Sequence, residues 1–323
     1  MNVAHISLRE LDMFVRELYE YAYIAFVKAL QRLLPDINDD FNTINSLIHT
    51  ICIAYSRYVT LKTVDKIHDI ALKNSHITST FNVLLKLSKK LGLSLSQLMK
   101  FITRQARELF CLNNCIVEVK DLNSEVPNIW YARGLSLADG TRNQMFASTE
   151  ASLAKIVLST FKRVKIQLGK PEYALSISKP KFQIRFIPVM SNNLIREIWH
   201  WRDRVLSGDF SVLPEAYDDW VSFFAGVFDG DGYVKVKHYW AIDVGVSCGL
   251  DVKGSVVGNI LKFGADLGYF TLGKFDSSRC IQYFRLDIKT LNFLKDITHH
   301  LNHDLRRFKI ERYLTRKYVS LRS

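Results

Sequence analysis

Two aspartates, each followed by glycine at the end of an apolar segment, are the residues of this chain best suited to chemistry. Asp139 lies near the end of Trp130–Gly140, and Asp231 lies near the end of Val221–Gly232. Two carboxylates brought together in a basic protein predict a divalent metal site that faces a phosphodiester. The question is then which elements could hold the two acids side by side.

Small residues at four-residue spacing precede each aspartate and predict a close pair of helices. They are Gly134 and Ala138 in the first segment and Gly226 and Gly230 in the second. Residues four apart share one face of a helix, so each helix would present a stripe that has almost no side chains. Two such stripes can pack closely and place Asp139 beside Asp231.

The second segment resembles the LAGLIDADG motif of homing endonucleases and related intron maturases. Phe224–Gly232 (FAGVFDGDG) matches that motif at its small positions, its apolar positions, both acids and the final glycine. Ala132–Gly140 (ARGLSLADG) is a degenerate match, with Arg133 and Leu137 where the motif has Ala and Asp. Both copies keep the eighth-position acid that the family uses for metal. The resemblance covers residues 128–323.

The resemblance implies an α+β fold with two pseudo-symmetric αββαββα-like half-units that form a DNA-binding saddle. It divides the chain into the first, degenerate half at residues 121–210 and the second half at 211–323. Residues 1–120 would be a mostly α-helical N-terminal domain. Because the two halves differ in sequence, we expect a pseudo-symmetric monomer.

The resemblance also implies an activity, the site-specific hydrolysis of both strands of duplex DNA with Mg²⁺ or another divalent cation. Asp139 and Asp231 would be the catalytic acids, and the metal would lie against them and against Gly140 and Gly232. Lys309, which follows the last expected helix, would be the basic catalytic residue that stabilises the transition state. Two alternatives use the same scaffold: a DNA-binding regulator that does not cut, and a maturase that binds intron RNA.

Alternating polar residues mark the strands expected to contact DNA. In the second half, strands are expected at Tyr233–Trp240, Ile242–Val246, Thr271–Phe275 and Gln282–Ile288, with helices at Ser255–Leu267 and Leu291–Leu301. In the first half, they are expected at Lys165–Leu168, Tyr173–Ser178 and Lys181–Ile187, after a helix at Glu150–Arg163 that leaves little room for a first hairpin. Polar side chains on one face of each sheet would read base edges in the major groove. The candidates are Lys165, Gln167, Lys181, Gln183, Arg185, Tyr233, Lys235, Lys237, Ser247, Tyr283 and Arg285.

The first 110 residues have helical periodicity, and residues 112–128 are typical of a linker. Phe81–Leu91 and Ser94–Phe110 predict a helix–turn–helix-like pair with Ser94 or Ser96 as a cap. This pair is basic, with Lys86, Lys89, Lys90, Lys100, Arg104 and Arg107. One interpretation is an accessory DNA-binding module, and the other is a helical bundle with a solvated charged face.

Composition agrees with an anionic partner, because the net charge is +12 and the isoelectric point is near 9.4. The five cysteines are scattered and form no pair of CxxC clusters, which predicts reduced thiols and no zinc site. The first residues lack the pattern of a signal peptide, and no apolar run reaches the roughly 20 residues that span a bilayer. We therefore expect an intracellular, cytoplasmic protein without a membrane partner.

Overall fold

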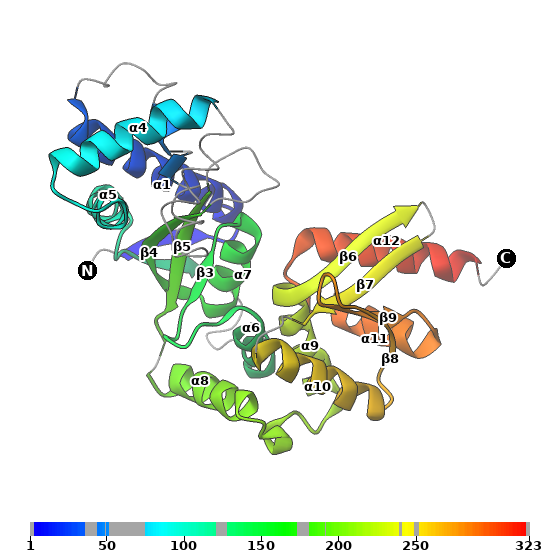
Figure 1. Ribbon diagram of the computed structural model, residues 1–323. Coiled ribbons are helices and arrows are strands. Elements are labelled where there is room, and N and C mark those ends of the chain that lie inside the picture. Colours follow the sequence, from blue (N-terminus) through cyan, green and yellow to red (C-terminus); the bar gives the residue numbers. More distant parts are fainter. Residues whose placement is uncertain are drawn as a thin grey trace. The chain divides into compact units, whose positions relative to one another are not determined.

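Helical and alternating hydrophobic patterns combine in this chain into the α+β fold that the sequence predicts. The computed structural model describes residues 3–35, 44–48, 50–51, 75–120, 128–172, 181–190, 192–238, 241–248 and 252–320 (Figure 1). The expected strand Tyr173–Ser178 lies outside these residues. The chain divides into two compact units, one of residues 1–118, 147–151 and 165–187, the other of residues 119–146, 152–164 and 188–323. No helix among the described residues has the length and apolar character needed to span a membrane.

A five-stranded sheet is central to the first unit. Its strands, in spatial order, are β1 (Val3–Ser7), β2 (Ile116–Lys120), β4 (Arg163–Glu172), β5 (Lys181–Pro188) and β3 (Phe146–Ser148). Buried and half-buried residues alternate along β5, because one face of the sheet packs against helices. Helix α1 (Leu11–Leu33) lies on this face, where the rings of Phe26 and Phe182 stack with centroids 4.6 Å apart.

The N-terminal region contains two strands that the helical interpretation lacked. Strand β2 lies within the segment that we expected to be a linker, and its residues Ile116, Val117 and Val119 are buried. Helices α4 (Ser75–Lys90) and α5 (Leu95–Leu109) confirm the predicted helix pair. Ser94 is the cap, because its hydroxyl accepts from the Gln97 amide while the Gln97 side chain accepts from the Ser94 amide.

The basic residues of this helix pair have two different environments. Arg107 donates from Nε to the Leu168 carbonyl at 2.8 Å and from Nη2 to the Gly169 carbonyl at 3.4 Å, so it joins α5 to β4. The other five are exposed: Lys86, Lys89, Lys90, Lys100 and Arg104. An exposed basic surface is compatible with both interpretations of the helix pair, which stay predictions.

The second unit confirms the element order expected after the second motif. It runs α9 (Tyr217–Asp231), β6 (Gly232–His238), β7 (Ala241–Ser247), α10 (Val252–Asp266), β8 (Thr271–Asp276), β9 (Ile281–Arg285) and α11 (Ile288–Thr298). The strands form one sheet in the order β6-β7-β9-β8. A core of aromatic side chains joins α9 to the sheet and to α11, through Trp220, Phe224, Phe270, Phe284 and Phe293.

The segment that follows the last expected helix forms a further helix, α12 (Asp304–Ser320). Ile310 and Leu314, four residues apart, are both buried, and they give this segment an apolar stripe. Lys309 therefore lies within a helix of the second unit.

Three more helices accompany the first motif: α6 (Ile129–Asp139), α7 (Ala151–Phe161) and α8 (Asn192–Leu206). The hairpin after α6 is contracted to its base, as the limited space before α7 predicted. Gly140 makes an isolated antiparallel bridge to Phe146. The corresponding pair after α9 is Gly232 with Val246, which lies at the base of the long β6–β7 hairpin. The other strands keep their order, because β3-β5-β4 in one sheet corresponds to β7-β9-β8 in the other.

Candidate metal and nucleic-acid site

Helices α6 and α9 cross at their glycines and lie side by side near the centre of Figure 1. A methyl group on Gly134 would overlap the main-chain carbonyl of Phe223, and one on Gly226 would overlap that of Tyr131. In both cases the oxygen would lie within 3.0 Å, a separation that real Cβ atoms essentially never show. The contact is reciprocal, because Gly134 and Gly226 are 92 positions apart and so are Tyr131 and Phe223.

The two aspartates come directly after this crossing. A methyl group on Gly230 would lie 2.7 Å from Oδ2 of Asp139 and would overlap the Cβ of Ala138. The Asp139 carboxylate therefore lies against the last turn of α9, which ends at Asp231. Both aspartates are half-buried, and the glycine directly after each of them is buried. The structure thus brings the two predicted acids to adjoining helix ends.

The two helices also end in the same backbone conformation. Gly140 has φ −68° and ψ 144°, and Gly232 has φ −68° and ψ 141°. The N–H of each donates to the carbonyl four residues earlier, that of Ser136 or of Phe228. A methyl group on either glycine would overlap this same carbonyl, so glycine is needed here for close approach, with an ordinary negative φ.

Arginines that the sequence analysis did not identify cover the C-terminal carbonyls of both helices. Arg202 of α8 donates from Nε to the Ser136 carbonyl at 2.9 Å and from Nη2 to the Gly140 carbonyl at 2.8 Å. Arg306 of α12 reaches the corresponding turn of α9, where it donates to the Phe228 carbonyl at 2.7 Å. A positive charge at a helix C-terminus is favourable because the helix dipole is negative there.

The position of Arg202 in its helix is the signal that could have identified it. Ile195, Ile198 and Val205 are buried on one stripe of α8, and Arg202 occupies the same stripe at helical spacing. A charged residue on an apolar stripe indicates a buried partner.

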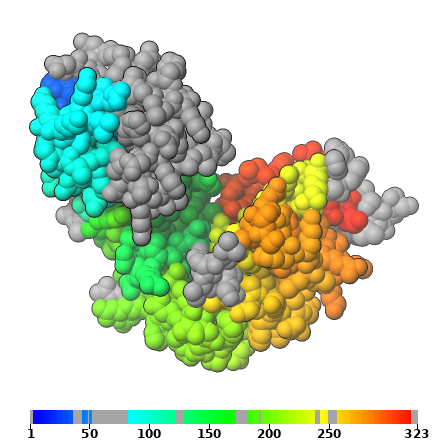
Figure 2. Space-filling model, in the orientation of Figure 1, coloured from blue at the N-terminus to red at the C-terminus, as the bar shows by residue number. Residues whose placement is uncertain are grey.

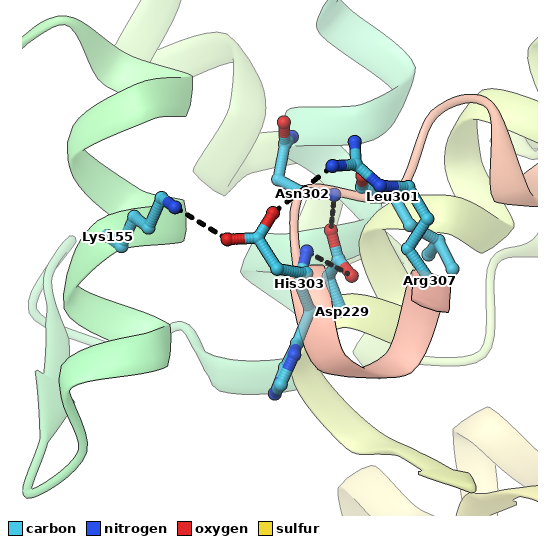
Figure 3. A network of polar contacts seen from close by, with 7 residues as sticks. Lys155, Asp229, Leu301, Asn302, His303 and Arg307 are labelled. Carbon is cyan, nitrogen blue, oxygen red and sulfur yellow. Dashed lines mark hydrogen bonds and ion pairs between the residues drawn. The ribbon is translucent and has the colours of Figure 1, made fainter. Parts of the chain in front are cut away.

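Asp229, at the sixth motif position, is a buried acid with structural contacts (Figure 3). Its Oδ2 accepts from the Tyr131 hydroxyl at 2.5 Å. The same oxygen accepts from the Asn302 amide at 2.6 Å, and Oδ1 accepts from the His303 amide at 3.2 Å. Burial raises the pKa of Asp229 to about 6, although these donors favour its charged form. The carboxyl group therefore ties α6 and α9 to the start of α12.

Charged residues also attach the start of α12 to α7. Lys155 contacts Asp304 at 2.6 Å, and the second carboxylate oxygen of Asp304 accepts from Arg307 at 3.2 Å. Arg307 in turn donates to the Leu301 carbonyl at 3.4 Å (Figure 3). These contacts fix the helix that carries Arg306.

Replacing Asp229 by asparagine is expected to change how stability depends on pH. The folded-state pKa of about 6 exceeds the ordinary value of 3.8, so protonated Asp229 favours folding below about pH 4 and this contribution is lost as pH rises through 6. The free energy of unfolding of the wild type, minus that of Asp229→Asn, should fall by about 2.5 kcal/mol between pH 4 and pH 8. Urea unfolding at a series of pH values measures this difference. A difference that is flat with pH would contradict the prediction.

The polar residues predicted for the second half share one face of its sheet. Tyr233 pairs with Gly245, and Gly245 pairs with Tyr283, so the two tyrosine rings meet with centroids 5.8 Å apart. Side chains alternate along a strand, so Lys235, Ser247 and Arg285 lie on this face as well. The β6–β7 hairpin (yellow) and the β8–β9 hairpin (orange) lie at the surface in Figure 2.

Two more cations lie near this face. Lys237, next to an irregularity in the β6–β7 pairing, forms an ion pair with Asp243 at 2.7 Å. Lys274, which was not among the predicted residues, holds its Nζ 5.5 Å above the centre of the Tyr283 ring. It was not predicted because it lies where the pairing of β8 is irregular, so the alternation of polar and apolar residues that identified the other residues does not apply there.

The polar residues predicted for the first half lie on one face of the first unit's sheet. They are Lys165 and Gln167 on β4, and Lys181, Gln183 and Arg185 on β5. Gln183 lies beside Gly169 of the neighbouring strand, which shows that the odd-numbered residues of both strands share a face. Some of these side chains have protein partners: Lys181 contacts Glu150 at 3.4 Å, and Gln167 contacts Asn114 at 2.8 Å.

Lys309, on α12, extends its side chain to the backbone of β6. Its Nζ donates to the Val234 carbonyl at 3.4 Å. Val234 is three residues beyond Asp231, which corresponds to about 10 Å along a strand. Burial and, to a smaller extent, the charge of Asp231 raise the pKa of Cys248, directly after β7, to about 11.

The donors at the two helix ends are all oxygens, a set that suits Mg²⁺, which binds one or two carboxylates and keeps sites for water and phosphate. Among the described residues, His, Cys, Asp and Glu form no group of three or more that could bind a metal ion. Comparison of the sequence with protein-family models and with curated proteins finds no match.

Proposed function

We propose that this chain is a site-specific double-strand DNA endonuclease that hydrolyses phosphodiesters with a divalent cation, Mg²⁺ above all. The observation that carries the proposal is the reciprocal glycine crossing, which ends in one half-buried carboxylate from each helix. Such close packing is costly to arrange, and it places like charges at two negative helix ends. A bound cation offsets that repulsion.

Asp139 and Asp231 would bind the metal, and Gly232 would offer a main-chain carbonyl beside them. The cation would lower the pKa of an attacking water and neutralise charge on the leaving oxygen. Lys309 would add positive charge on the side of β6. No serine or histidine nucleophile is required in such a reaction.

The polar sheet faces would supply affinity and specificity. Lys235 and Arg285 share a sheet face with the pair of Tyr233 and Tyr283, and Lys274 lies over the Tyr283 ring. Cations here would contact phosphates, and Arg and Gln would read guanine and adenine edges. The finer fold proposal is that residues 121–210 and 211–323 are LAGLIDADG half-units of a monomer that binds DNA as a saddle. Gly134 and Gly226 are 92 positions apart, and so are Asp139 and Asp231. This constant interval supports the proposal of two half-units.

The experiment uses a library of DNA duplexes with a randomised central region. Duplexes that the full chain retains in Ca²⁺ are sequenced, and the enriched duplex is then incubated with protein in Mg²⁺ or in EDTA. We expect retention in Ca²⁺, cleavage of both strands in Mg²⁺ and no cleavage in EDTA. A random-sequence duplex of the same length is the control.

A DNA-binding regulator is the second candidate, and the contracted hairpin after α6 favours it. With only the base of that hairpin present, the first half has less surface with which to hold a strand for cleavage. An enriched duplex that stays intact in Mg²⁺ would support the regulator and reject the nuclease. Enrichment that an excess of structured intron RNA abolishes would favour the maturase.

A further inference from the structure

We propose that α4 and α5 form a helix–turn–helix that binds duplex DNA. Lys100 and Arg104 of α5 enter the major groove, and the lysines of α4 contact phosphates. This second DNA-binding site lies in a part of the chain that the proposed function does not use, and binding there requires neither a metal ion nor cleavage.

The turn between the two helices has a defined backbone structure. At the end of α4 the Leu93 amide donates to the Ser88 carbonyl at 3.0 Å. The Gly92 amide donates to the Lys89 carbonyl at 3.2 Å, which completes a Schellman motif. Gly92 has φ +63°, a left-handed conformation that glycine adopts without strain. Because Ser94 caps α5 directly afterwards, the connection is as short as in a helix–turn–helix.

Helix α5 has one buried face and one exposed face. Leu98, Met99 and Ile102 are buried, and both α1 and α4 contact this helix. In Figure 1 α5 is seen along its axis, and α4 lies across it. The exposed face carries Lys100 and Arg104, four residues apart. In a helix–turn–helix the second helix presents such a face to the major groove, while the first helix crosses the backbone.

The charged residues of the helix pair are all basic up to the last turn of α5. Between residues 75 and 107 the chain has six Lys or Arg residues and no Asp or Glu. Lys89 and Lys90 lie in the last turn of α4, where the helix dipole favours them. Lys100 and Arg104 lie in the middle of α5, where like charges four residues apart destabilise a helix. A face that serves only solubility usually mixes both signs, so this face indicates an anionic partner such as a phosphate backbone.

Arg104 is already oriented for contact with a base. Its guanidinium carbon lies 5.2 Å from the centre of the Phe101 ring, three residues earlier on α5. This stacking restricts the rotamers of Arg104, so less side-chain entropy is lost when the guanidinium binds. Arginine donates two parallel hydrogen bonds to O6 and N7 of guanine in the major groove. We therefore expect Arg104 to read a base and Lys100 to add affinity beside it.

Binding of the full chain in Ca²⁺ to the enriched duplex, and to versions of that duplex trimmed from either end, tests the inference. The double variant Lys100→Gln/Arg104→Gln should bind the enriched duplex about a hundredfold more weakly than the wild type does. Trimming the end that α5 contacts should weaken the wild type by a similar factor and leave the double variant within about threefold. Both altered residues are exposed, and circular dichroism confirms that the variant folds.

Two single variants are compared with the double variant. Lys86→Gln, on α4, should weaken binding to all sequences alike and reduce the slope of log affinity against log salt by about one. Lys295→Gln removes an exposed lysine of α11 in the other unit and is the matched control, which should bind as the wild type does. Cleavage of the bound duplex in Mg²⁺ at saturating protein should be the same for the wild type and all of these variants.

The outcomes separate this inference from the proposed function. Equal affinity of the wild type and the double variant would overturn the inference and leave the nuclease proposal intact. A loss of the same size on every trimmed duplex would also overturn it, because that result indicates charge attraction without a docked helix. So would displacement of the wild type by an excess of duplex RNA, whose narrow major groove does not admit a helix. The predicted effect of trimming on a duplex that stays intact in Mg²⁺ would support the helix–turn–helix and reject the nuclease alone.

Discussion

Replacing Gly226 by alanine is expected to lower the free energy of unfolding of the second unit by more than about 4 kcal/mol, or to prevent its folding. The added methyl would overlap the main-chain carbonyl of Tyr131 on α6. A main-chain atom inside a helix cannot rotate away, so the helices must separate and lose the packing between them. Chemical denaturation followed by circular dichroism measures the loss, and Gly134→Ala should behave alike because the contact is reciprocal.

Gly258→Ala is the matched control for this prediction. Gly258 also lies inside a helix, α10, and nothing would lie within 4 Å of its added methyl. Alanine restricts the unfolded chain more than glycine does, so this variant should be more stable by about 0.5–1 kcal/mol. Equal stability of Gly226→Ala and Gly258→Ala would show that the close crossing is not required for folding.

Replacing Asp231 by asparagine is expected to reduce cleavage of the enriched duplex by about a thousandfold or more. Asparagine has nearly the same shape but lacks the charge that holds a divalent cation, and metal catalysis supplies several kcal/mol of transition-state stabilisation. Affinity for the duplex in Ca²⁺ should stay within about threefold, because the sheet face is unchanged. Gel electrophoresis with each strand labelled separately measures both strand cuts.

Two further variants define what this result means. Asp266→Asn removes an exposed acid at the end of α10 and should leave both cleavage and affinity unchanged. Asp139→Asn should also abolish double-strand cleavage if the degenerate motif is active. Undiminished cleavage by Asp231→Asn would remove Asp231 from the mechanism, whatever the behaviour of Asp139.

Local pattern was enough to predict most of the second unit. Its helices and strands follow each other within short stretches of chain, and the alternation from Tyr233 onward is unbroken up to Lys237. The alternation along a strand does not say which residues of different strands share a face. The pairing of β7 with β6 and with β9 shows that Tyr233 and Tyr283 do. The contracted hairpin was also predictable, because few residues separate Gly140 from α7.

Features that depend on distant partners were missed. Strand β1 forms only because β2, more than a hundred residues later, lies beside it, and each has five residues. Arg202 donates to carbonyls 66 and 62 positions earlier in the sequence. The residues near it in the sequence indicate only that a charged residue lies on an apolar stripe. The pattern of residue types within one segment contains no information about contacts with a segment far away in the sequence.

The reciprocal crossing has a consequence for how this protein can evolve. A clash with a side chain can be relieved by a second substitution that replaces the neighbouring residue by a smaller one. Such positions can therefore change together in compensating pairs. The oxygens that face Gly134 and Gly226 belong to the main chain, which no substitution removes. These two glycines therefore have no compensating partner, and we expect both to be retained among homologues even where the adjoining acids have been lost together with any activity.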